Sequence, residues 1–186
     1  MRLTFITALF LVISCQNPAP TTGSGEDNRG DNISGTEVII PQNVLNYLKD
    51  NFPGWEIPDT SEYMKAWWTF YDRDQITYYV TTDFNDDGLA DYAFTLKSPD
   101  SLRLVILVSD GNAFTHWVAE DFNEPYSGNN LKFGLMITPP GRTDRVVDDI
   151  PVSLILKSNG IAFMEEEVMI RIYYWDDRKF KVLRAK

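Results

Sequence analysis

The sequence predicts an α+β fold of predominantly antiparallel β-strands, arranged as a bent sheet or a sandwich of about eight or nine strands with one or two N-terminal helices. From residue 76 onward, apolar, aromatic and β-branched runs alternate with short turn segments rich in Asp, Asn and Gly. The links between these runs are too short for parallel crossovers, so neighbouring strands are expected to be antiparallel. Before residue 76, apolar residues recur at helical spacing instead.

The helical region contains one amphipathic segment and a shorter candidate. Apolar side chains recur every three or four positions over residues 41–51, which predicts a helix with one apolar face. A proline suits the first turn of this helix, and the Pro53-Gly54 pair ends it. We expect a second, short helix to begin at the polar pair Thr60-Ser61 and to carry two tryptophans.

The strands are predicted from their apolar and β-branched content. The run at 102–109 is continuously apolar, which indicates a central strand covered on both faces. Asp110-Gly111 is a tight-turn signal, whereas 120–130 and 139–151 are expected to be a polar and a charged loop. Residues 158–160 are expected to turn one hairpin. The predicted strands are 76–82, 91–97, 102–109, 113–119, 131–138, 152–157, 161–164, 168–175 and 180–184.

Charge and residue counts exclude several classes of function. The chain has 17 basic and 27 acidic residues, a net charge of −10. A nucleic-acid partner is not expected, because phosphate binding needs a basic face. Cys15 is the single cysteine and His116 the single histidine, so an internal disulfide and a zinc site with several Cys or His ligands are excluded. No G-x-S-x-G motif supplies a nucleophile for a catalytic triad.

Residues 1–14 are predicted to be a lipoprotein signal peptide. A short positive start precedes an apolar run, Leu3 to Ile13, that is shorter than the about 20 residues needed to span a bilayer. The segment Val12-Ile13-Ser14-Cys15 resembles the bacterial lipobox. This resemblance implies lipidation of Cys15 and anchoring in the cell envelope, facing the periplasm or the cell surface. An uncharged Gln after the cysteine favours the outer membrane. The alternative is an ordinary signal peptide with a chance cysteine.

The remaining chain divides into a tether and a domain. Residues 15–36 are polar and rich in Gly, Pro and Ser, a composition that cannot bury enough surface to fold. We therefore interpret them as a lipidated cysteine followed by a disordered tether. Residues 37–186 are expected to form a single β-rich globular domain.

The stretch from Asp83 to Asp91 has the pattern of a loop that folds around a hard cation, most plausibly calcium. Side-chain oxygens stand at alternate positions in Asp83, Asn85 and Asp87, and a glycine at the sixth position permits a sharp reversal. The backbone carbonyl of Leu89 and the carboxylate of Asp91 would complete the set of ligands, Asp91 directly or through water. The alternative is an ordinary hairpin turn of solvated acidic residues.

This pattern resembles the D-x-N-x-D-G-x-x-D calcium loops of FG-GAP and related cell-surface repeats, which join two strands. Position twelve is Phe94 rather than the bidentate Glu of an EF-hand, and the motif occurs once. The chain also resembles a family of uncharacterised bacterial exported proteins, through the segments 52–55, 83–93 and 173–175. The resemblance of the loop implies a bound calcium ion, and the resemblance to the exported family points to no particular activity.

Other candidate sites have simpler interpretations. Glu165-Glu166-Glu167 is typical of a charged turn, and His116 of a packed or edge histidine. The Asp-Asp pairs lie in turns, which does not place two acids across a cleft. Aromatic residues of strands are usually core, although a platform for a sugar or peptide stays an alternative. The residues concerned are Trp67, Trp68, Trp117, Tyr173, Tyr174 and Trp175.

These observations lead to one main hypothesis. We expect a lipid-anchored, non-enzymatic envelope protein with one structural calcium loop and a binding or structural role, acting on an envelope protein or a glycan. An inhibitor or immunity-type module that blocks an envelope or foreign enzyme is the first alternative. A protruding loop at 120–130 or 139–151 would favour it. A glycan- or peptide-binding module comes next, and a hydrolase last.

Overall fold

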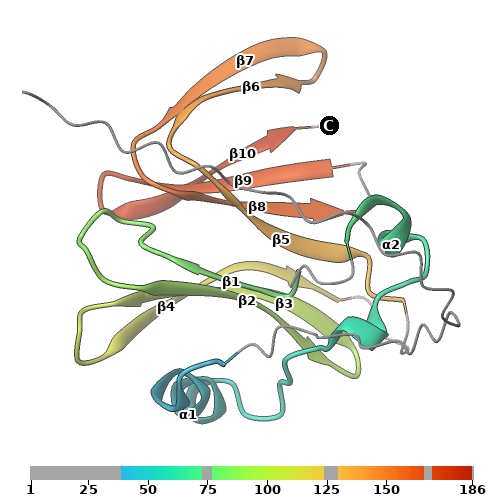
Figure 1. Ribbon diagram of the computed structural model, residues 1–186, viewed down its shortest axis with the longest axis vertical. Helices are drawn as coiled ribbons and strands as arrows, with labels where there is room; N and C mark the ends of the chain where they lie inside the picture. The colour runs from blue at the N-terminus through green and yellow to red at the C-terminus, as the bar shows by residue number, and fades with distance from the viewer. Residues whose placement is uncertain (1–38, 73–76, 124–129, 166–168, 186) are drawn as a thin grey trace, which may run out of the picture. The chain divides into compact units, whose positions relative to one another are not determined.

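The computed structural model describes residues 39–72, 77–123, 130–165 and 169–185 (Figure 1). These residues contain α1 (Gln42–Asn51), the 3-10 turn η1 (Thr60–Glu62), α2 (Trp67–Phe70) and ten strands in three antiparallel sheets. The β-dominated class is confirmed, with more strands than predicted. The strands are β1 (Tyr79–Thr82), β2 (Asp91–Ser98), β3 (Ser101–Ser109), β4 (Phe114–Phe122), β5 (Phe133–Thr138), β6 (Gly141–Val147), β7 (Ile150–Leu156), β8 (Gly160–Glu165), β9 (Met169–Asp176) and β10 (Lys179–Ala185).

Two four-stranded sheets face each other across the main hydrophobic core. The first sheet has the order β1-β2-β3-β4, and the second has the order β10-β9-β8-β5. Apolar side chains from both inner faces are excluded from water, which is the main source of stability in such a sandwich. They include Leu104 and Ile106 of the first sheet and Phe133, Ile161 and Phe163 of the second.

A backbone hydrogen bond joins the two sheets on the side of β1 and β5. The backbone N–H of Leu135, in β5, donates to the carbonyl of Thr77, just before β1, at 2.6 Å. On the opposite side, β4 and β10 meet through side chains, such as the rings of Trp117 and Phe180 at 6.3 Å. The strands therefore form two facing four-stranded sheets that are linked at one side by this backbone hydrogen bond.

Helix α1 covers the outer face of the first sheet. Val44 and Leu48 of the helix pack with Phe94, Val105 and Leu107 in a second apolar cluster. Because alternate residues of β3 point to opposite faces, one set enters this cluster and the other enters the main core. The prediction of a central strand at 102–109, covered on both faces, is confirmed.

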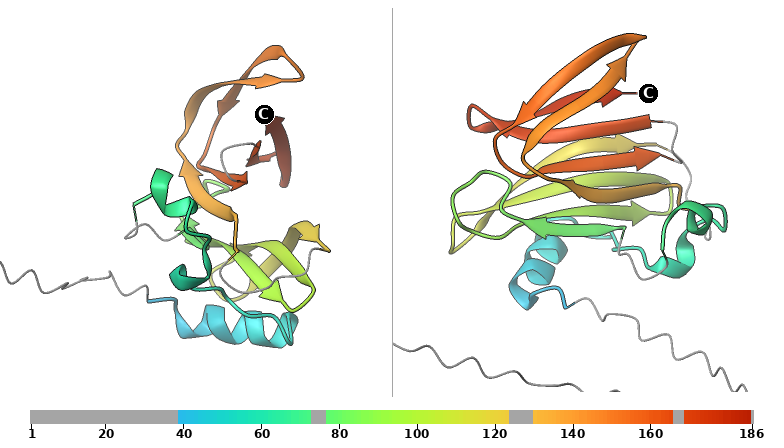
Figure 2. Two further views of the ribbon diagram at one scale, coloured as in Figure 1. Left: turned by 90° about the vertical axis from the view of Figure 1, so that its right-hand side faces the viewer. Right: turned by 45° about the horizontal axis from the view of Figure 1, so that its top comes forward.

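The predicted charged loop at 139–151 is wrong, because this segment forms a two-stranded arm. Strands β6 and β7 pair from Gly141–Leu156 to Val147–Ile150, and the arm extends beyond the second sheet (Figures 1 and 2). Asp148 and Asp149 make the turn at its end with φ of 48° and 64°, as a two-residue hairpin turn requires. One further strand, β6, is thereby added to the predicted number, because β7 overlaps the predicted strand 152–157.

The predicted hairpin around residues 158–160 is also wrong. Strand β7 pairs with β6, whereas β8 pairs with β5 and β9. The Ser158-Asn159-Gly160 segment is an offset in one long ribbon, opposite Pro139-Pro140 on the other strand. Its turn-like composition reflects this irregularity, because residues that suit turns also suit breaks in a ladder.

Strand β4 continues to Phe122, beyond the predicted end at residue 119. The register between β3 and β4 shifts at Leu104 and Val105, which marks a β-bulge. A bulge reverses the inward and outward alternation of the residues that follow it. Glu120 and Phe122 consequently point into the sandwich, where Glu120 contacts Tyr173 and the ring of Phe122 stacks on that of Phe163.

The N-terminal helices are split differently from the prediction. Asp59, rather than Thr60, caps η1, and its carboxylate accepts from the N–H of Ser61 at 2.6 Å. The tryptophans belong to the separate helix α2. Trp67 is 1% exposed and fills the space above Gly134, where an added Cβ would lie 2.2 Å from its ring. Glycine at this position is required by the close approach of the indole.

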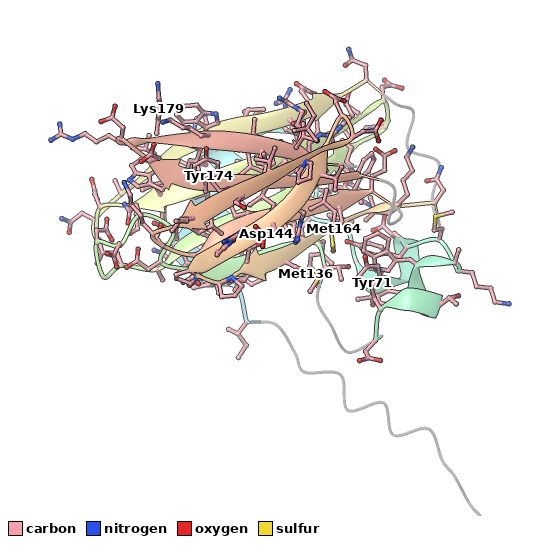
Figure 3. All side chains as sticks on the ribbon, turned by 90° about the horizontal axis from the view of Figure 1, so that it is seen from above. Tyr71, Met136, Asp144, Met164, Tyr174 and Lys179 are labelled. Atoms are coloured by element: carbon pink, nitrogen blue, oxygen red, sulfur yellow. The ribbon has the colours of Figure 1, made fainter. Side chains whose placement is uncertain are left out.

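Aromatic and sulfur contacts fix the segment after α2 against the second sheet. The hydroxyl of Tyr71 donates to Sδ of Met164 at 3.6 Å, and both residues are labelled in Figure 3. The ring of Tyr71 also stacks on Trp67, with centroids 4.4 Å apart. This packing attaches the residue that follows α2 to the second sheet.

Residues 35–186 form one compact unit, and both apolar clusters lie inside it. Because the unit holds its own cores, we expect it to fold without the preceding residues. The predicted signal peptide, Cys15 and the tether lie outside the described residues, as do two members of the Glu165–Glu167 run.

Candidate metal-binding loop

The loop from Asp83 to Ala90 joins β1 to β2, as predicted (Figure 1). The strands pair from Tyr79–Phe94 to Thr82–Asp91, so the loop begins and ends at adjacent positions of the ladder. Phe84 is the exception to its polar surroundings, because its side chain is fully buried in the main core. This anchor leaves the rest of the loop at the edge of the domain.

The carboxylate of Asp83 organises the loop. Its Oδ1 accepts from the backbone N–H groups of Asn85, Asp86 and Asp87 at 3.2, 2.7 and 3.2 Å. Its Oδ2 accepts from the N–H of Gly88 at 2.7 Å. The chain therefore curls around one negative charge, as it does at the first ligand position of calcium loops.

The side chains of Asn85 and Asp87 turn toward the same centre. The N–H of Asp87 lies 3.2 Å from both Asp83 Oδ1 and Asn85 Oδ1. The amide nitrogen of Asn85 donates to Asp87 Oδ2 at 2.8 Å. The structure thus links three of the five predicted ligands by hydrogen bonds within the loop.

The reversal of the chain follows the sequence pattern. Gly88 has φ of 83°, a left-handed conformation that glycine adopts without strain. Asp86 has φ of 63°, which aspartate tolerates better than most residues. The N–H of Leu89 donates to Asp87 Oδ1 at 2.9 Å, and its side chain leans toward Gly111 in the next turn.

Asp91 differs from the other four predicted ligands. It is fully buried, and its two oxygens accept from the N–H groups of Phe84 and Ser109, both at 2.9 Å. Burial is the main cause that raises the pKa of Asp91 to about 6. The hydrogen bonds from the N–H groups of Ser109 and Phe84 lower this pKa, whereas the nearby carboxylates of Asp87 and Asp83 raise it further. Its present role is to tie both ends of the loop to β3.

Two residues that the sequence did not point to hold the loop against the second sheet. The hydroxyl of Ser158 donates to the carbonyl of Phe84 at 2.6 Å. The amide of Asn159 donates to Thr82 Oγ1 at 2.8 Å and to the Asp83 carbonyl at 3.5 Å. The composition Ser-Asn-Gly predicts a hairpin turn, and no local signal reveals a contact with a loop so distant in sequence.

The donor set fits a hard cation in part. Carboxylate and amide oxygens are what calcium prefers, and each carboxylate oxygen that accepts one N–H keeps a second lone pair. No group of three or more Asp, Glu, His or Cys is arranged for a metal ion among the described residues. Asp83, Asn85 and Asp87 would therefore hold an ion with help from the Leu89 carbonyl. Asp91 is buried behind these residues and would support the loop through its hydrogen bonds to Phe84 and Ser109.

A second polar cluster lies inside the sandwich, and no motif of the sequence points to it. Glu120 accepts a short hydrogen bond from the hydroxyl of Tyr173, which is buried. Arg184 and Arg171 approach the same oxygen of Glu120 at 3.3 and 3.6 Å. Burial raises the pKa of Tyr173, and its bond to Glu120 raises that pKa further, so the phenol is a donor. The cluster joins β4 to β9 and β10 across their unpaired side.

The other candidates occupy structural positions. His116 lies on the edge strand β4, where its Nδ1 is 3.0 Å from the Tyr47 hydroxyl and its ring is 4.9 Å from that of Phe52. Trp67 and Tyr173 are buried, whereas Trp117 is 44% exposed. These aromatic residues consequently do not share one surface.

Comparisons with known proteins add no assignment. No protein-family model, curated protein sequence or solved structure matches the chain. In the part of the chain that the structure describes, no helix combines the length and apolar character needed to cross a membrane.

Proposed function

We propose that this chain is a non-enzymatic protein of the bacterial cell envelope, anchored through a lipid on Cys15, whose loop Asp83–Asp91 binds one structural calcium ion. The observation that carries the calcium assignment is the convergence of the side-chain oxygens of Asp83 and Asn85 on the backbone N–H of Asp87. The lipobox resemblance at Val12–Cys15 supports the proposed location in the cell envelope.

The ion would strengthen a junction between the two sheets. The loop is attached to the first sheet through Asp91 and to the second through Ser158 and Asn159. Without an ion, the carboxylates of Asp83 and Asp87 repel each other and the buried Asp91. A divalent cation converts this repulsion into attraction, with an affinity of about 10⁻⁴–10⁻³ M as in other extracellular modules.

A calcium titration of residues 35–186, followed by the melting temperature, tests the site. Saturating calcium at about ten times Kd is expected to add about 1.4 kcal/mol to the free energy of unfolding. Asp87→Asn should abolish most of this gain. Asp86→Asn is the matched control, because it removes one charge from the next position, which is outside the ligand set.

The calcium proposal fails if the wild-type melting temperature does not respond, or if the Asp86 and Asp87 variants respond equally. In the second case the loop would act only through its total charge. Magnesium at the same concentration serves as a comparison, because it demands regular octahedral geometry and should stabilise less.

The lipid anchor has a separate test. The full chain expressed in bacteria is expected to incorporate labelled fatty acid and to sediment with membranes, and Cys15→Ser should remove both properties. If Cys15→Ser kept both properties, the lipid anchor would be rejected, and the calcium proposal would be unaffected. Ser14→Ala, which keeps a small residue before the cysteine, provides the control.

An inhibitor or immunity-type module is the second candidate, and the β6–β7 arm favours it. The arm occupies the predicted loop 139–151 and exposes Val146, Ile150 and Ile155. An exposed apolar ribbon is suited to entering a partner's cleft. If this is its role, the domain should lower the activity of an envelope or foreign enzyme that it captures, and Ile150→Asp should restore that activity.

A further inference from the structure

The outer strand of the arm carries large apolar side chains whose exposed fraction is high for a monomeric protein. Ile155 is 73% exposed, Ile150 is 63% exposed, and Val146 on the paired strand is 46% exposed. The seven residues of β7, Ile150 to Leu156, include no charged side chain. Uncharged, exposed edge strands are templates for pairing with another strand.

Strand β7 has one edge without a strand neighbour among the described residues. The sheet of the arm has the order β6-β7, and β6 lies on the side of β10, so that β7 is outermost (Figure 1). Val147 and Ile150 close the two-residue turn, so Ile150, Val152, Leu154 and Leu156 direct their backbone groups to β6. The backbone groups of Pro151, Ser153 and Ile155 consequently face outward.

The proline supports this orientation. Proline has no N–H, and within a sheet it is found where its nitrogen faces away from the ladder. At Pro151 it leaves the pairing of β7 with β6 intact. The free edge of β7 therefore offers the N–H and C=O of Ser153 and Ile155 and the C=O of Pro151.

We propose that β7 pairs antiparallel with β7 of a second copy of this chain, in a two-fold symmetric dimer centred on Ser153. In this register each Ser153 exchanges both backbone hydrogen bonds with its counterpart. The N–H of each Ile155 donates to the carbonyl of Pro151 in the second copy. Four hydrogen bonds form, and the two arms become one four-stranded ribbon.

The pattern of apolar and charged side chains favours this register of the two β7 strands, with a second copy of the chain as the partner. Centring on Ser153 places Val152 opposite Leu154 and Ile150 opposite Leu156, with no like-charge pair along the strand. At each end, Asp149 lies opposite Lys157 of the second copy, whose side chain is 81% exposed. An antiparallel copy of β7 is thus complementary to β7 in both apolar pattern and charge.

The dimer is expected to be weak. Two seven-residue strands bury less than the about 1,200 Å² of stable complexes. The acidic chains, each with a net charge of −10, also repel each other at long range. Measurements should therefore use about 0.15 M salt, where charges more than about 8 Å apart are screened.

A single cysteine at the dyad gives the most direct test. Residues 35–186 contain no cysteine, so Ser153→Cys introduces the only thiol. Hydrogen-bonded strand pairs have Cα atoms about 5.5 Å apart, which suits a disulfide. Mild oxidation should cross-link Ser153→Cys at least tenfold faster than Asp144→Cys. The latter is the matched control, since Asp144 is the cross-strand neighbour of Ser153 on β6 and its copies would lie about 14 Å apart.

Sedimentation analysis of the unmodified domain supplies the equilibrium test. We expect a concentration-dependent dimer and its loss in Ser153→Pro, which removes an outward-facing N–H together with the hydroxyl that donates to Asp144 and accepts from Arg142. An unchanged melting temperature would show that the arm remains folded. The charge variants Asp149→Lys and Lys157→Asp should each weaken the dimer, and their combination should restore it, even if proline disturbs the arm.

Three outcomes overturn the proposal. They are a domain that stays monomeric up to about 1 mM, equal cross-linking at positions 153 and 144, and a double charge variant as weak as either single one. This proposal does not depend on calcium or on the lipid anchor, so its failure leaves the proposed function intact.

Discussion

The hydroxyl of Ser158 donates a 2.6 Å hydrogen bond to the carbonyl of Phe84, and both residues are buried. Ser158 precedes the second sheet's β8, whereas Phe84 belongs to the loop that closes β1 onto β2. The bond therefore connects the two sheets at the candidate metal-binding loop.

Ser158→Ala is expected to destabilise the domain by about 1–3 kcal/mol, because it leaves the buried Phe84 carbonyl without this partner. Urea unfolding measures the change. Ser98→Ala is the control, since its hydroxyl makes only a long, half-buried bond of 3.4 Å and should cost less than about 0.5 kcal/mol. Equal effects would mean that the Ser158 bond contributes nothing special.

Asp91 predicts a dependence of stability on pH. Its pKa is raised by burial to about 6 in the folded state, whereas that of an unfolded aspartate is about 3.9. The folded state thus binds the proton more tightly, and stability falls as pH rises from about 4 to about 6, by up to about 3 kcal/mol. Above that range the contribution is constant.

Urea unfolding in a chelator at pH 4, 5, 6 and 7 tests this dependence. The free energy of unfolding of the wild type minus that of Asp91→Asn should decrease with rising pH and level off above about pH 6. Taking this difference cancels the contributions of the other carboxylates. A difference that is flat or rises with pH would contradict the prediction. Saturating calcium should reduce the decrease, because a cation favours the ionised carboxylate.

Gly134→Ala is expected to cost about 3 kcal/mol, because the new methyl group would lie 2.2 Å from the ring of Trp67. Calorimetry of single and double variants measures the effect. In the background of Trp67→Phe, where the ring is smaller, the same substitution should cost at least about 1 kcal/mol less. Additive effects would show that the indole does not determine the size limit.

Arg178→Gly is expected to stabilise the domain by about 0.5–1 kcal/mol. Asp177 and Arg178 turn β9 into β10 with φ of 53° and 61°, and a left-handed conformation strains arginine but not glycine. A rise in the melting temperature checks this. Lys179→Gly, one position later in the strand, should lower it.

The elements that were predicted correctly are those whose local pattern agrees with their packing. Strand β3 is apolar on both faces because one face meets the second sheet and the other meets α1. The candidate loop was predictable for a similar reason, since Asp83, Asn85, Asp87 and Gly88 interact almost entirely with one another.

The features that were missed depend on distant partners. Strand β6 of the arm carries charged residues, Arg142 and Asp144, and the apolar Val146 on one face, because both faces of a projecting ribbon are partly in water. The bulge that turns Glu120 inward is defined only by its register with β3. Likewise, Asp91 reads as a ligand in the motif, and only the fold shows that two N–H groups already occupy its oxygens.

The bond between Leu135 and Thr77 has a consequence for the order of folding. Each sheet contains hairpins of consecutive strands, which close short loops, whereas this bond joins residues far apart in the sequence. Non-local contacts form late because the chain must first lose the entropy of closing a long loop. The docking of the first sheet against the second should therefore be the slow step of folding, after each sheet has nucleated separately.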